Sequence, residues 1–146
     1  MERNERERLN AVGTEVVRSA IKVHRSLGPG LLESAYQSCL AWELREKGLR
    51  VETEVHVPIE YQGQRLDVGY RIDMLVEGAV IIENKVLDRL LPIHTAQILT
   101  YLELRGIRLG YLLNWNVTLM KNGIHRFVVG SYSKERRKSR RSDSNS

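Results

Sequence analysis

Charged side chains interrupt two segments that otherwise have the composition of buried β-strands. Residues 79–87 are almost continuously apolar, yet Glu83 and Lys85 stand among them, and Asp73 stands inside the mostly apolar residues 71–76. Side chains alternate between the two faces of a strand, so Glu83 and Lys85 share one face and Asn84 points to the other. A buried carboxylate or ammonium group is costly unless a partner compensates for it, so these charges need a chemical explanation.

The two carboxylates have the chemistry of a divalent metal site. A short turn at Glu77-Gly78 joins the two segments, so antiparallel pairing can bring Asp73 beside Glu83. Carboxylates about 4 Å apart repel by roughly 4 kcal/mol at an effective dielectric constant of about 20, and Mg²⁺ or Mn²⁺ would remove that penalty. A bound ion would lower the pKa of a water molecule and neutralise phosphate charge. Lys85 would orient that water or offset developing negative charge.

The elements that must position these residues follow from hydrophobic periodicity and turn signals. Apolar residues three or four apart indicate helices, and Gly28-Pro29-Gly30 and Gly48 end the first two. The second helix has a wide apolar face that includes Leu32 and Trp42, which predicts a largely buried helix. The predicted order is two helices (residues 9–27 and 31–47), three strands (51–61, broken by Pro58, then 65–76 and 79–87), a helix (92–105), a strand (109–113) and a β-hairpin arm leading into 124–129.

The positive charge of the chain is concentrated at one end. The 146 residues carry a net charge of +5, and residues 131–146 hold six basic and two acidic side chains, which leaves only +1 for residues 1–130. We therefore predict one folded domain over residues 1–130 and a disordered basic tail over residues 131–146. Such a tail either holds phosphate backbones or serves only as a solubilising extension.

Cysteine content and the lack of long apolar runs predict a cytoplasmic protein with no membrane contact. Cys39 is the single cysteine, so the chain has no internal disulfide and no cysteine-based zinc site. No apolar run approaches the roughly 18 residues of a membrane span. The charged N-terminal residues do not have the pattern of a secretory signal.

Asp73 and Glu83-Asn84-Lys85 resemble the D…(D/E)xK core of the PD-(D/E)xK nuclease superfamily, and the predicted element order is similar to its αβββαβ core. Within that superfamily, residues 23–36 resemble the signature of the bacterial GxxExxY protein family, whose named positions fall on Gly30, Glu33 and Tyr36. Residues 92–102 and 109–114 are similar to the helix and strand that follow in that family.

The resemblance implies a fold, an activity and a set of site residues. The fold is an α/β mixed sheet of the restriction-endonuclease type, with an extra N-terminal helix and a C-terminal β-hairpin. The activity is metal-dependent hydrolysis of phosphodiester bonds in nucleic acid, DNA before RNA, with Mg²⁺ or Mn²⁺, and a homodimer is an open expectation. Asp73 and Glu83 would be the main metal ligands, Glu33 an outer ligand, Lys85 the catalytic lysine, and Gln97 and Tyr101 polar site positions on the next helix. Asn84 departs from the usual apolar residue between Glu and Lys.

Plainer explanations exist for each of these residues. Glu33 would favour the helix macrodipole in any first turn. Asp73, Glu83 and Lys85 could form structural ion pairs, with Arg71 or with each other, and a lysine on an edge strand would only discourage aggregation. The stripe of His94, Gln97 and Tyr101 could be a solvated helix face. His24, Tyr36 and Cys39 are expected to be structural. For the whole chain, the alternative is a catalytically silent module that keeps the nuclease fold and binds nucleic acid or a protein partner.

Overall fold

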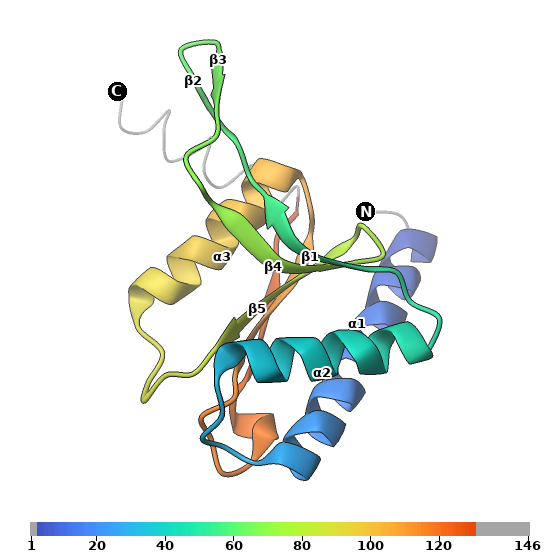
Figure 1. The fold of residues 1–146 in the computed structure, drawn as a ribbon. Coiled ribbons are helices and arrows are strands. Elements are labelled where there is room, and N and C mark those ends of the chain that lie inside the picture. The colour runs from blue at the N-terminus through green and yellow to red at the C-terminus, as the bar shows by residue number, and fades with distance from the viewer. Residues whose placement is uncertain (1–2, 131–146) are drawn as a thin grey trace, which may run out of the picture.

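A five-stranded mixed sheet forms the centre of the computed structural model, which describes residues 3–130 (Figure 1). The strand order is β1-β4-β5-β6-β7, so β5 is the central strand. Helix α3 connects β5 to β6, which pair in parallel, and the other neighbouring strands are antiparallel. The elements are α1 (Arg3–Leu27), α2 (Glu33–Glu46), β1 (Val51–His56), β2 (Ile59–Tyr61), β3 (Gln64–Leu66), β4 (Arg71–Val76), β5 (Val80–Lys85), α3 (Pro92–Arg105), β6 (Leu109–Asn114), η1 (Met120–Asn122) and β7 (Ile124–Val128). This architecture is the predicted α/β mixed sheet.

Helices cover both faces of the sheet, and β5 contributes to both cores. Val80 and Ile82 pack with α1 and α2, whereas Ile81 packs with α3. The alternation predicted from the sequence is therefore confirmed for this strand, and every described residue from Val80 to Asn84 is buried.

The two N-terminal helices differ in how well their burial was predicted. The apolar stripe of α1 is buried as expected, and the helix ends where Gly28 adopts a left-handed φ of 67°. The prediction of a largely buried α2 is wrong, because Trp42 is 60% exposed and Leu32 is 78% exposed. Only the side of α2 that carries Tyr36, Leu40, Ala41 and Leu44 is buried, since α1 and the sheet cover that side alone.

The predicted break at Pro58 is confirmed, and the strand predicted over residues 65–76 is interrupted between Leu66 and Arg71. Pro58 cannot donate a ladder hydrogen bond, so β1 ends at His56, and β2 and β3 form a separate hairpin that projects from the body (Figure 1). The turn at Glu77-Gly78 has φ values of 55° and 61°, and it joins β4 to β5 in a tight hairpin as predicted. The predicted C-terminal β-hairpin is present, because β7 pairs antiparallel with β6, and it forms an edge of the main sheet rather than a separate arm.

The predicted disordered tail, residues 131–146, lies outside the described residues. Among residues 3–130, no helix combines the length and the apolar character that crossing a membrane would require.

Candidate active site

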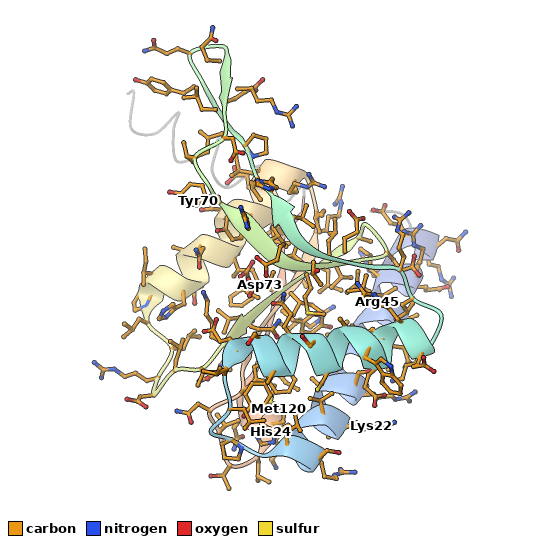
Figure 2. All side chains as sticks on the ribbon, viewed as in Figure 1. Lys22, His24, Arg45, Tyr70, Asp73 and Met120 are labelled. Carbon is orange, nitrogen blue, oxygen red and sulfur yellow. The ribbon has the colours of Figure 1, made fainter. Side chains whose placement is uncertain are left out.

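Asp73 and Glu83 lie opposite each other on β4 and β5, and each side chain accepts a hydrogen bond from a backbone N–H of the neighbouring strand. The pairing of Met74 with Ile82 places them at the next position of the same register. The Asp73 N–H donates to Oε1 of Glu83 (3.2 Å), and the Asn84 N–H donates to Oδ2 of Asp73 (2.8 Å). Figure 2 shows Asp73 in the middle of the molecule, on strand β4, which leads up to Tyr70 and the hairpin of β2 and β3. The predicted juxtaposition of the two carboxyl groups is therefore present.

A local distortion of β1 and β4 directs Asp73 toward β5. The regular pairing places Thr53 opposite Met74 and Val55 opposite Ile72, and between these pairs Glu54 has a φ of 54°. The Asp73 N–H donates to Glu83 across the site. Ile72 packs under α3 and Met74 under α1 and α2, although strict alternation would place both on one face. Left-handed backbone at a non-glycine residue is costly and is typical of functional sites.

Burial makes the carboxyl pair hard to ionise. Glu83 is only 3% exposed, and burial, with the charge of Asp73 next, raises the pKa of Glu83 to about 9. Burial also raises the pKa of Asp73, while the hydrogen bond from the Asn84 N–H acts to lower it. Both carboxyl groups therefore favour the neutral, protonated form more than free carboxyl groups do. The site therefore lacks enough positive charge to favour two ionised carboxylates.

The ion pairs considered from the sequence are not formed. Within residues 3–130, no ion pair with an N–O distance of 4.0 Å or less includes Asp73, Glu83 or Lys85. Lys85 is half-buried at the end of the central strand, so the edge-strand explanation for this lysine is also wrong. The charge of Lys85 acts at longer range to lower the pKa of both carboxyl groups, against the larger effect of burial.

Glu33 begins α2 next to the end of β5. Its Oε1 accepts a hydrogen bond from the Val86 N–H (3.3 Å), and its side chain is exposed. Among the residues that the structure describes, no three His, Cys, Asp or Glu side chains are grouped so that they could hold a metal ion. The structure thus brings Asp73 and Glu83 together and places Glu33 on the neighbouring backbone.

Comparison with protein families identifies this arrangement. A family model described as the PD-(D/E)XK nuclease superfamily matches residues 10–127. The chain belongs to this superfamily. Neither the curated proteins nor the solved structures contain a match. The matched residues include Asp73, Glu83 and Lys85, and superfamily members usually use divalent metals.

Helix α3 adds two polar residues to this PD-(D/E)XK domain. Gln97 Nε2 donates to the Tyr101 hydroxyl (3.2 Å), and Tyr101 is 4% exposed, so this part of the stripe is not a solvated face. Burial, and then the charges of Glu83 and Asp73, raise the pKa of Tyr101, which keeps its phenol protonated. His94, the first residue of the stripe, has a structural role instead, because its Nδ1 accepts the Leu91 N–H at the start of α3.

Asn84, the departure from the superfamily pattern, is fully buried on the face opposite Glu83. Its Oδ1 accepts a hydrogen bond from Trp115 Nε1 (2.9 Å), and its Nδ2 donates to Gln37 Oε1 (3.3 Å). Trp115 stacks on Tyr36 with ring centroids 4.7 Å apart, and Tyr36 is fully buried. An amide is therefore accommodated at this position because α2 and the segment after β6 supply its partners.

Sequence reasoning missed Glu54 as part of this PD-(D/E)XK site and did not assign a role to Gln37. Gln37 Nε2 donates to Glu54 Oε1 (2.9 Å), and the charge of Glu54 contributes to raising the pKa of Asp73. The one available signal was the position of Gln37, one turn after Glu33 on the same face of the helix. The structural role expected for His24 is consistent with the hydrogen bond of its Nε2 with the Val117 carbonyl (2.8 Å).

Proposed function

We propose that this PD-(D/E)XK domain hydrolyses phosphodiester bonds in nucleic acid, DNA before RNA, with Mg²⁺ or Mn²⁺. The observation that carries this proposal is the pair of Asp73 and Glu83, whose carboxyl groups each accept a backbone N–H from the other strand, with Lys85 on the same central strand as Glu83. The superfamily membership supports nuclease activity. Residues 1–130 would form the domain, and residues 131–146 would add long-range attraction for phosphates.

The carboxyl pair fits a hard divalent cation. Mg²⁺ in proteins commonly binds through one or two carboxylates and keeps several water molecules, so two ligands from the chain suffice. Asp73 and Glu83 would hold the ion, and Glu33 would act as an outer ligand from the start of α2. Bound there, the ion would supply an acidic water molecule and positive charge for a phosphate group.

Two side chains near the pair would act on the substrate, and a third would position one of them. The Lys85 ammonium group would orient the attacking water and offset negative charge as the phosphorus–oxygen ester bond breaks. The Tyr101 phenol, which burial keeps protonated, would donate a hydrogen bond to a phosphate oxygen. Gln97 would hold Tyr101 in place through the hydrogen bond that it donates.

We further propose that the chain belongs to the GxxExxY family within the superfamily. Its signature lies where the turn after α1 meets the start of α2: Gly30 has a φ of 100°, and the hydroxyl of Tyr36, in α2, accepts the Leu31 N–H (3.1 Å) and donates to the Gly28 carbonyl. A homodimer and a cytoplasmic location remain parts of this proposal.

Cleavage assays with purified protein test the proposal. The wild type should cut DNA in the presence of Mg²⁺ or Mn²⁺, whereas Asp73→Ala and Lys85→Ala should not. Lys121→Ala, which removes an exposed lysine of η1, is the matched control and should cut like the wild type. No cutting by the wild type with either metal on DNA or RNA would overturn the proposal, as would full activity of Asp73→Ala.

One observation favours a second candidate, the catalytically silent binding module. Residues 1–130 carry a net charge of only +1, so the domain itself has little charge to attract nucleic acid. Calorimetric titration separates the two functions. A divalent metal site that is lost in Glu83→Gln supports the nuclease. DNA binding that needs no metal and disappears when residues 131–146 are deleted supports the module.

A further inference from the structure

We propose that Gln37 is a positioning residue for the Asp73–Glu83 pair and acts through Glu54 and Asn84. The inference rests on the proposed function, because it assigns Gln37 a role in holding the metal-binding carboxyl groups. Gln37 lies on α2, and its two hydrogen-bond partners lie on β1 and β5. A single amide thus joins the strands on either side of β4, the strand that carries Asp73.

The contact with Asn84 connects Gln37 to Asp73. The Asn84 backbone N–H holds Asp73 Oδ2 at 2.8 Å, while the Asn84 side chain lies fully buried on the other face of β5. That side chain is held by Gln37 Oε1 and by Trp115 Nε1. If Gln37 is removed, Met74 Sδ (3.3 Å) is the remaining acceptor for the Asn84 amide. Sulfur is a weak acceptor, so the Asn84 position would lose much of its restraint.

The contact with Glu54 stabilises the distortion that directs Asp73 toward β5. Glu54 has the left-handed φ of 54° at the point of β1 that faces Asp73, and its exposed side chain would otherwise be free to turn toward solvent. Gln37 Nε2 holds its carboxylate at 2.9 Å. Gln37 therefore contacts both residues that hold Asp73 in place: Asn84, whose N–H bonds to its carboxylate, and Glu54, which lies opposite it on β1.

Residues that orient metal ligands without touching the metal commonly change affinity or activity by 10- to 100-fold when they are replaced. We expect Gln37→Leu, which removes both hydrogen bonds at similar size, to raise the Mn²⁺ concentration for half-maximal cleavage by about tenfold. Gln37→Glu should also be impaired, because it places a carboxylate against Glu54. Gln64→Leu, at an exposed glutamine of β3, is the matched control and should match the wild type.

The exchanged pair Gln37→Glu with Glu54→Gln tests the mechanism directly. The amide and the carboxylate swap sides, so the hydrogen bond can form in reverse, the acceptor for Asn84 is kept and the net charge is that of the wild type. The double variant should recover to within about threefold of the wild type. A merely structural role would lower thermal stability without changing the metal dependence.

Hydrogen exchange supplies a readout that does not depend on activity. The backbone N–H of Asn84 should exchange at least about tenfold faster in Gln37→Leu than in the wild type. The double variant Gln37→Glu with Glu54→Gln should restore its protection. Unchanged exchange, or a double variant no better than Gln37→Glu alone, would overturn the inference. A wild type that does not cut nucleic acid would overturn the proposed function, and the exchange result would still decide the role of Gln37.

Discussion

Replacing Glu83 with glutamine should make the metal-free protein less sensitive to rising pH. The pKa of Glu83 is raised from 4.5 to about 9 in the folded protein, mainly by burial. Between these values the unfolded chain has released the proton that the folded chain keeps. The folded state therefore binds more protons, and the free energy of unfolding falls as the pH rises.

The size of this effect follows from the linkage relation. Each pH unit inside the window costs about 1.4 kcal/mol, so the wild type should lose about 3 kcal/mol between about pH 5.5 and about pH 7.5 through this group. Glu83→Gln cannot ionise, yet its amide oxygen can still accept the Asp73 N–H that Glu83 accepts. The variant should therefore fold and should lack this loss.

Urea denaturation of both proteins with a metal chelator present measures the effect. The difference between the two free energies of unfolding cancels the histidine titrations, which both proteins share. It should shift by about 3 kcal/mol in favour of the variant across this range. Glu52→Gln, at an exposed carboxylate of β1, is the matched control. A difference between wild type and Glu83→Gln that stays constant with pH would refute the raised pKa of Glu83.

Three further predictions concern the same region. Binding of Mg²⁺ or Mn²⁺ to the wild type near pH 7 should release about one proton, because the ion displaces the proton that Glu83 keeps at this pH; calorimetry in buffers of different ionisation enthalpy counts it, and a count of zero would contradict the assignment. Lys85→Ala should lower the cleavage rate by about 100-fold or more while metal affinity changes little, and a parallel loss of affinity would instead make Lys85 part of the binding site. Trp115→Phe removes the donor to the buried Asn84 Oδ1 and should lower the free energy of unfolding by about 1–3 kcal/mol, measured by urea denaturation; an unchanged value would mean that the hydrogen bond is replaced.

Much of the fold could be predicted because the signals are local. The apolar spacing of α1, the limits of α3 and the turn at Glu77-Gly78 each depend on residues within a few positions of one another. That turn also determines the register between β4 and β5, so the adjacency of Asp73 and Glu83 follows from residues that are close together in the chain. The exposure of Trp42 could not be predicted in this way, since it depends on which side of α2 the rest of the chain covers.

The sequence by itself determined the chemical types at the site, the alternation that separates Glu83 from Asn84, and the adjacency of the two carboxyl groups. Only the tertiary structure decided that burial raises the pKa of both carboxyl groups, that Asp73 is directed toward β5 by a distortion opposite Glu54, and that Gln37 joins Glu54 to Asn84. The physical reason is the separation along the chain of the residues that interact. Periodicity and turn chemistry act between near neighbours, whereas burial and these hydrogen bonds link segments that are far apart in the chain and meet only when the helices pack on the sheet.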